Sequence, residues 1–169
     1  DALMVDLLDT DGNCVIDNGA NSFTPLMAYL IDNDAFALLE EAGRHVYIHS
    51  IVGGGDTLHD TASGFVSTAQ STTAPIVLWH NEHFGLLQTP SGKLFTDSPT
   101  FHEYAARVRG QVRLTVRNSD TFGADIKKMN TARLTFEEVL ASDKFNVMEK
   151  QRIKTVYRDV FDQLDRIQW

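Results

Sequence analysis

A chain of 169 residues, of which 43% are hydrophobic, is long enough to form one domain with a buried core. It has no run near the roughly 18 apolar residues of a membrane helix, and its acidic start excludes a secretory signal peptide. The net charge of −8 argues against a general nucleic-acid-binding surface, and the single cysteine excludes an internal disulfide framework. These features predict a cytoplasmic protein in which Cys14, followed by apolar β-branched residues, is a buried structural thiol.

The first third of the chain has the pattern of a strand, a helical region and a second strand. Residues 14–17 (CVID) are a short apolar run and are predicted to form the first strand. Thr24 is the predicted N-cap of a helix that begins at Pro25, because proline is tolerated at the first helical position. One or two helices then continue to Gly43, which suits the left-handed stop just past a helix end. The β-branched run 45–52 predicts the next strand.

The middle of the chain continues this alternation. A moderately amphipathic helix is predicted over residues 58–70, and a fully apolar strand over residues 76–79. Ser98 is the predicted cap of the next helix, with proline at the first helical position. A further strand is predicted over residues 112–117.

The C-terminal region, from about residue 134 to residue 168, is predicted to be helical. Thr135 and Glu138 have the spacing of a capping box at its start. Its basic residues alternate with acidic ones, so we interpret them as a solvated helix face rather than as a basic patch. These basic residues are Lys150, Arg152, Lys154 and Arg158.

Short apolar strands that alternate with helices indicate an α/β domain with a mostly parallel sheet and helices on both faces. Residues 1–169 are therefore predicted to form a single three-layer domain. In such sheets ligands bind beyond the carboxyl ends of the strands. The residues at those predicted positions are Asp17 and Asn18, Gly53 to Asp56, His80 and Asn81, and Arg117 to Asp120.

Asp17 follows the first predicted strand directly. At this position P-loop NTPases hold the water shell of Mg²⁺, and a carboxylate oxygen suits such a hard cation. The competing interpretation is an Asx-turn or a helix cap, because aspartate favours both.

Two other motifs near the strand ends also have alternative interpretations. Asn81 can offer a donor and an acceptor to an adenine edge, or its side chain can cap a turn. The run Gly53-Gly54-Gly55 stands between a strand and a helix, where backbone N–H groups attract phosphate. It lacks the lysine and the Ser/Thr of a phosphate-binding P-loop, so a flexible turn is the favoured interpretation.

His80 and His83 suggest a zinc site as a further hypothesis, because two histidines close to Glu82 resemble part of such a site. With Asp17 they would make a small metallohydrolase. Zinc sites normally recruit more ligands from a known framework, so this is the weakest of the hypotheses.

Several long segments together resemble the TraL-type proteins of conjugative plasmids. The resemblance covers nearly the whole chain from about Asp6, and the order of elements is more distantly similar to the ParA/MinD-type (deviant Walker) P-loop ATPases. The segments are VIDNGANSFTPLMAYL, HVYIHSIVGGGDTLHDTASGF, VLWHN, RLTFEEVLA and MEKQRIKTVYRDVFDQLD.

This resemblance implies a cytosolic nucleotide-binding protein of conjugal DNA transfer, with ATP and Mg²⁺ as cofactors of the intact parent. Asp17 matches the acid that follows a central strand near Mg²⁺ in that ATPase class. Asn81 matches by order an asparagine that contacts adenine, and Asn118 lies in a loop that helps to enclose the base. The implied partners are other conjugal transfer proteins, and a homodimer is an open alternative.

TraL-like proteins begin with a Gly-rich loop, K-G-G-x-G-K-[ST], on their first strand, and nothing in this sequence matches that loop. Since the sequence also lacks an initial methionine, we expect the first strand and the P-loop of the parent to lie outside this chain. The chain alone is then expected neither to bind ATP tightly nor to hydrolyse it. The alternative is a non-enzymatic adaptor that binds transfer proteins through its helical C-terminal region, with Val156, Val160, Phe161 and Leu164 as anchors.

Overall fold

The computed structural model describes residues 1–169, except for the side chain of Ala20. Its centre is a parallel sheet of three strands in the order β1-β2-β3, joined by strand–helix–strand crossovers. The strands are β1 (Ile48–Gly53), β2 (Ile76–Asn81) and β3 (Val108–Leu114). The register places Ile48 beside Ile76 and Trp79 beside Val112. The predicted α/β domain with parallel strands is confirmed.

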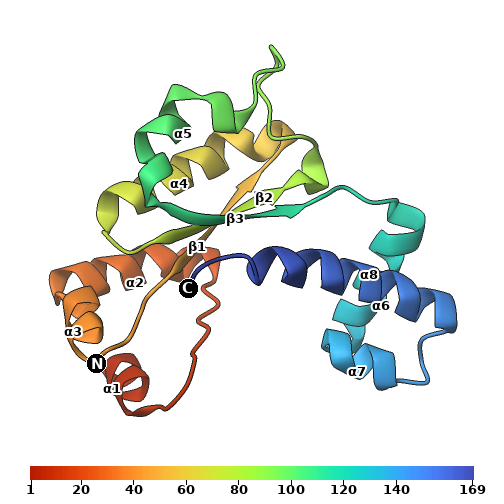
Figure 1. The fold of residues 1–169 in the computed structure, drawn as a ribbon, viewed down its shortest axis with the longest axis horizontal. Coiled ribbons are helices and arrows are strands. Elements are labelled where there is room, and N and C mark those ends of the chain that lie inside the picture. The colour runs from red at the N-terminus through yellow and green to blue at the C-terminus, as the bar shows by residue number, and fades with distance from the viewer.

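Helices cover both faces of the sheet, as Figure 1 shows. The crossover helices α4 (Leu58–Ser71) and α5 (Pro99–Tyr104) lie on one face, and α8 (Val147–Leu164) lies on the other. Phe65 of α4 is fully buried and its ring meets those of Phe95 and Phe101 in the core of the first face. The opposite face buries Val77 and Val112 against Ile167.

The two edges of the sheet differ. Gln163 of α8 covers the outer edge of β3 with its side-chain amide, which accepts from the backbone N–H of Arg113 (2.7 Å) and donates to the carbonyl of Arg113 (3.1 Å). β1 is the other edge, and within the described residues no strand pairs with its outer side. An unpaired strand edge is a template for adding another strand.

Two groups of helices flank the sheet. α1 (Ala2–Asp9), α2 (Ala20–Asp32) and α3 (Ala35–Glu41) share a small core around Met4, Ala35 and Leu39. At the other end, α6 (Ala124–Ala132) and α7 (Phe136–Ala141) pack on α8 around Val139, Phe145 and Ile153. We call this second group, residues 124–158, the helical lobe. Across the described residues, no helix is both long enough and apolar enough to cross a membrane.

Two ion pairs tie α8 to the rest of the helical lobe. Arg152 binds the carboxylate of Asp125, which is almost fully buried, through two of its nitrogens. Lys128 lies 2.8 Å from the carboxylate of Glu149, which is itself part of a capping box with Asn146 at the start of α8. Because a buried charge needs a partner, the pair of Asp125 with Arg152 holds α8 against α6.

Most of the predicted helix signals are confirmed. The side chain of Ser98 accepts from the backbone N–H of Phe101 at the start of α5. Thr135 and Glu138 form the predicted capping box at the start of α7. Gly43 has a positive φ of 76° just beyond α3, as a left-handed helix stop requires.

The predicted strand over residues 14–17 is wrong. Residues 13–19 have no regular structure and pair with no strand, and the side chain of Val15 is 95% exposed. Cys14 is exposed too, so the prediction of a buried thiol is also wrong. An apolar run forms a strand only where another strand supplies hydrogen-bond partners, and this one lies beside none.

The boundaries of α2 and of all three strands also differ from the prediction. α2 begins at Ala20, with Gly19 as its N-cap, so that Pro25 lies inside the helix instead of at its first position. β3 begins at Val108, four residues before the predicted strand, and ends at Leu114. The alternating burial of β3, whose central Val112 is fully buried, was obscured in the sequence by arginine, glycine and glutamine.

Candidate functional site

The carboxyl ends of the three strands form the edge at which parallel sheets bind ligands. The loop after β1 is in direct backbone contact with the loop after β2. A Cβ atom on Gly54 would lie 1.8 Å from the carbonyl oxygen of Gly85, and one on Gly55 would lie 2.2 Å from that of Phe84. The glycine run is therefore required by close packing of the two loops.

The backbone N–H groups of this glycine run are already occupied. That of Gly53 donates to Thr61 Oγ1 (3.0 Å), and that of Gly54 donates to the carbonyl of Asn81 (3.0 Å). That of Gly55 points at the carbonyl of Leu86 (3.5 Å). A phosphate cradle needs free N–H groups that converge on the anion. The predicted turn is confirmed in place of a phosphate loop, but it is a tightly packed turn.

The two predicted adenine-binding residues both cap turns. The side-chain oxygen of Asn81 accepts from the backbone N–H of His83 (3.1 Å) at the end of β2. That of Asn118 accepts from the N–H groups of Asp120 (2.9 Å) and Thr121 (3.1 Å), at the start of a short π-helical turn, Ser119–Gly123. The side-chain oxygens of both residues are therefore engaged in capping hydrogen bonds. Whether these residues contact a nucleotide is not tested by this arrangement, and that contact stays a prediction.

Asp17 lies in the irregular segment between α1 and α2 and not at the end of a strand. Its side chain is exposed, and no hydrogen bond or ion pair joins it to another described residue. The Mg²⁺ role of Asp17 therefore stays a prediction. As placed, Asp17, Asn81 and Asn118 do not form a complete site for ATP and Mg²⁺.

A polar cluster that sequence reasoning only partly identified lies at the ends of β2 and β3. His80 is buried and its Nε2 is 2.8 Å from Gln111 Oε1 of β3. The carboxylate of Glu82 is also buried, and Arg113 Nε approaches it to 3.4 Å. The parallel register of β2 and β3 brings these four side chains together, which no spacing along the chain could reveal.

The zinc hypothesis gains no support from this cluster. His80 is directed to Gln111, whereas the ring of His83 packs against Phe84 with 4.7 Å between centroids. Across the side chains that the structure describes, no group of three or more His, Cys, Asp or Glu could hold a metal ion.

A second cluster joins distant parts of the chain on the face of the sheet next to the β1 edge. Trp79 Nε1 donates to His49 Nδ1 (2.9 Å), and the ring of Trp169 is stacked on the His49 ring with 6.0 Å between centroids. Tyr47 meets Trp169 edge-on. Because an indole N–H can only donate, His49 must present an unprotonated Nδ1 to Trp79.

Acid is expected to destabilise the fold through these two histidines. Burial lowers the pKa of His80 below its usual value of 6.5, although the Gln111 hydrogen bond opposes the shift, and burial lowers the pKa of His49 likewise. The unfolded chain therefore takes up protons before the folded chain does. The free energy of unfolding should be constant above about pH 6.5 and fall as the pH drops through the lowered pKa values.

Urea unfolding at about pH 7.5 and about pH 5.5 measures this dependence, in a range where carboxylates stay ionised. His80→Gln should lose part of the pH dependence, whereas His59→Gln, at an exposed position, should keep all of it. A protein that became more stable toward pH 5.5 would contradict the burial argument.

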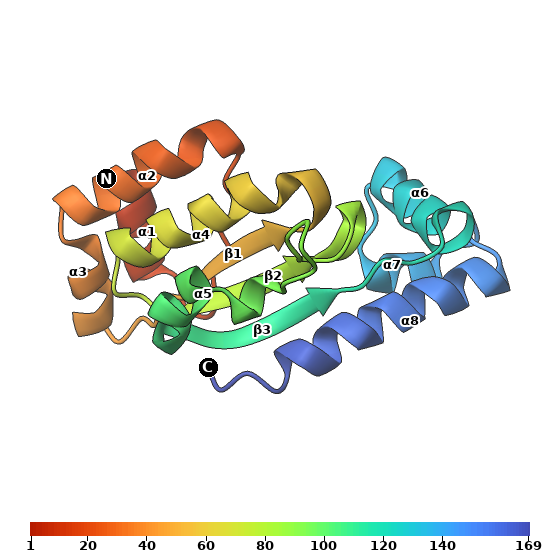
Figure 2. The same cartoon turned by 90° about the horizontal axis from the view of Figure 1, so that it is seen from above.

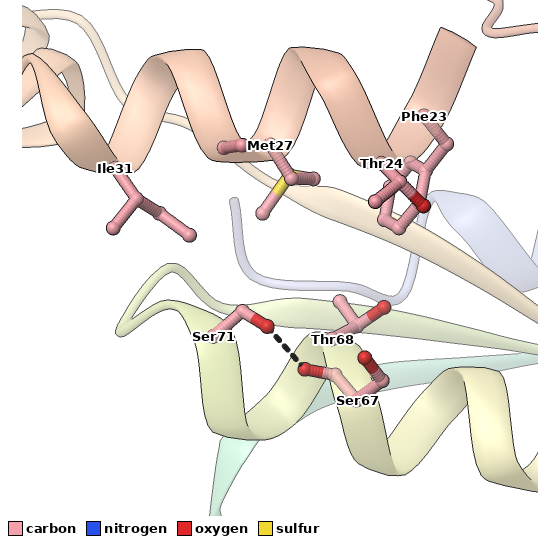
Figure 3. Close-up of a pocket in the computed structure, with 8 residues that line it drawn as sticks. Phe23, Thr24, Met27, Ile31, Ser67, Thr68 and Ser71 are labelled. Atoms are coloured by element: carbon pink, nitrogen blue, oxygen red, sulfur yellow. Dashed lines mark hydrogen bonds between the residues drawn. The ribbon is translucent and has the colours of Figure 1, made fainter. Parts of the chain in front are cut away.

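Two hollows lie away from the strand ends. One, of about 210 Å³, separates α2 from α4 and is shown in Figure 3. The side chains of Phe23, Met27 and Ile31 point from α2 toward the hydroxyl groups of Ser67 and Ser71 on α4, so apolar and polar walls face each other. The other, of about 390 Å³, lies at the amino ends of β1 and β2 and includes Arg44 and Tyr47. Neither hollow touches the predicted site residues.

Comparison with known proteins shows what the chain is related to. It is 39% identical to Protein TraL from Escherichia coli over 167 residues, which is 98% of this chain and 69% of that protein. A second Escherichia coli Protein TraL is 36% identical over the same shares of the two chains. No protein-family model and no solved structure matches. Similarity of this extent over nearly the whole chain places it in a family: the chain belongs to the TraL family.

Proposed function

We propose that the chain acts in plasmid conjugal transfer as part of a nucleotide-binding protein. The phosphate-binding loop of that protein would come from a segment outside residues 1–169. Membership of the TraL family supports the transfer role. In this proposal Asp17 orients the Mg²⁺ water shell, and Asn81 and Asn118 contribute to the base pocket.

The unpaired outer edge of β1 carries the nucleotide part of the proposal. A parallel sheet is ordinarily flanked by further strands or covered at its edges, and β1 has neither, while Gln163 covers the edge of β3. Ile51 of β1, which pairs in register with Trp79 on the face of α8, leaves its side chain 56% exposed. An added parallel strand at this edge would extend the sheet on the side of α2.

The irregular segment 13–19 fits the same proposal. It holds an apolar run with exposed Val15 and Ile16, followed by Asp17. Exposed apolar side chains of this kind mark a surface that another part of a protein covers. In the proposal, that part is the segment that carries the phosphate-binding loop.

The mass and N-terminal sequence of the protein isolated from its native host test this proposal first. We expect a product longer by several tens of residues, as judged from the length of the relatives, that opens with a Gly-rich lysine loop. Calorimetric titration of that product with ATP and Mg²⁺ should then show binding. Asp17→Asn should weaken Mg²⁺-dependent binding by about tenfold or more. Asp11→Asn, at another exposed aspartate, is the matched control.

The second candidate is a non-enzymatic adaptor. The observation in its favour is the helical lobe, which exposes apolar side chains, including Leu140 and Met148, outside the sheet. A native product that lacks the lysine loop and binds no ATP would favour this function. Conjugal transfer frequency should then be unchanged by Asp17→Asn.

A further inference from the structure

The charges of this chain are divided between its two ends. Nine carboxylates precede the first basic residue, Arg44, and all of them lie in or next to α1, α2 and α3. The helical lobe has the opposite balance, with eight Lys and Arg against five Asp and Glu. The net charge of −8 therefore conceals two poles of opposite sign.

The two poles lie far apart in the fold. In Figure 1, with the longest axis horizontal, α1 and α3 occupy one end of the molecule, and α6, α7 and the first half of α8 occupy the other. Figure 2 shows the same separation after a quarter turn about that axis. The sheet stands between them, so the acidic and basic ends of one molecule cannot meet.

A row of basic side chains on α8 forms the basic pole. Lys150, Lys154 and Arg158 are four residues apart, which places them on one side of the helix. Two other basic residues of the lobe are engaged by carboxylates, Arg152 by Asp125 and Lys128 by Glu149. Among the described residues no carboxylate pairs with the three of the row. Their charge is available to a partner.

Aromatic and aliphatic side chains accompany this row. The rings of Tyr157 and Phe161 lie on the same side of α8, with 4.3 Å between their centroids, and Phe161 is exposed. Leu140 of α7 and Met148 of α8 are exposed on the lobe as well. The basic pole thus offers apolar contact area beside its positive charges.

The acidic pole has the matching chemistry. α1 exposes Val5 and Leu8 together with the carboxylates of Asp6 and Asp9. α2 ends with exposed Ile31 and Asp32. Each pole combines exposed apolar side chains with charges that are in excess of one sign, acidic at the first pole and basic at the second.

We propose that copies of this chain associate head to tail, with the acidic pole of one copy on the Lys150–Lys154–Arg158 row of the next. The two surfaces differ, so the interface is heterologous and leaves one pole free at each end, which allows open chains of copies. Charge complementarity selects a second copy over other partners, because the chain itself carries both surfaces. The association involves neither Asp17 nor the edge of β1, and it is independent of nucleotide binding.

Sedimentation velocity of the chain over a range of concentrations tests this association. At about 20 mM salt the average mass should rise with protein concentration, and at about 300 mM salt the apparent dissociation constant should weaken by roughly tenfold or more. The triple variant Lys150→Glu, Lys154→Glu, Arg158→Glu has two acidic poles and should stay monomeric. The variant Asp6→Lys, Asp9→Lys, Asp32→Lys has two basic poles and should stay monomeric as well.

Mixing the two triple variants distinguishes charge pairing from loss of folding. Each variant carries the complement of the other, so the mixture should associate again at low salt. Lys150→Arg, Lys154→Arg, Arg158→Lys preserves the charges and should associate like the unchanged chain. Circular dichroism of every variant establishes that the helices are intact.

Three results would overturn the proposal. One is a chain that stays monomeric at low salt at the highest concentration reached. Another is association that is insensitive to salt or to reversal of the row. The third is a monomeric chain whose basic row binds a single-stranded oligonucleotide, since the row would then serve a nucleic acid and not a second copy.

Discussion

Replacing Gly54 by alanine is expected to destabilise the fold by on the order of 3 kcal/mol or more, because the new methyl group meets backbone atoms that have no alternative position. It would lie 1.8 Å from the carbonyl oxygen of Gly85 and 2.7 Å from that of Leu86. The loops after β1 and β2 would have to separate, and the hydrogen bond from Gly54 N–H to Asn81 would break. Denaturant unfolding followed by circular dichroism measures the loss.

Gly64→Ala is the matched control for this substitution. Gly64 lies inside α4, and a Cβ atom there has no neighbour within 4 Å. Since alanine favours helix over glycine, this variant should gain about 0.5–1 kcal/mol. Equal stability of Gly54→Ala and the unchanged chain would show that the two loops do not touch as described.

Replacing Phe65 by alanine should cost about 3–5 kcal/mol, the range for removing a buried phenylalanine. Phe65 has no exposed surface, and its ring contacts those of Phe95, Phe101 and Tyr104. The cavity would open between α4, α5 and the sheet, and the neighbouring rings could fill it only in part. The same unfolding experiment gives the change in free energy.

Phe84→Ala is the control that shows whether the loss of stability in Phe65→Ala comes from burial of the ring rather than from the removal of any aromatic side chain. Phe84 is 61% exposed on the loop after β2, and its ring meets only His83 among the aromatic contacts of the described residues. Its removal should change the stability by less than about 0.5 kcal/mol. A similar loss for both phenylalanines would place the hydrophobic core elsewhere.

Local signals in the sequence were sufficient to predict most of the helices and two of the strands, but not α1 or α6. Ser98 caps the backbone N–H of a residue three positions later, and Thr135 and Glu138 are also three positions apart. Their capping bonds could therefore be expected from spacing alone. The runs that became β1 and β2 are β-branched and apolar, and each is followed by a helix. Their parallel pairing follows from that alternation.

The strand predicted at residues 14–17 shows the limit of this reasoning. Its composition is that of a strand, but a strand requires a hydrogen-bonding neighbour, and composition does not say whether one is present. The early start of β3 shows the reverse case, in which a segment without the composition of a strand becomes one because a neighbouring strand is present. Polar residues alternate with Val108 and Val112, and pairing with β2 makes the segment a strand.

The candidate site could be predicted only by position. The strand ends correctly indicated where His80 and Asn81 would lie, because the carboxyl ends of parallel strands share one edge. The partners of these residues could not be predicted. Gln111 reaches His80 across 31 residues of chain, and Gly85 reaches Gly54 across a similar separation. Such contacts depend on the register and on loop packing, which leave no mark in the local sequence.

The arrangement around His49 determines which part of the fold tryptophan fluorescence reports on during unfolding. The chain contains two tryptophans, and both lie at His49, one hydrogen-bonded to its ring and one stacked on it. Tryptophan fluorescence therefore comes from a single corner of the sheet. This signal would change when Trp169 leaves that corner, but it would not change when the helical lobe unfolds. Circular dichroism, in contrast, reports the loss of the helices of the lobe. Two unfolding curves that fail to coincide would then reveal a lobe that unfolds separately from the sheet.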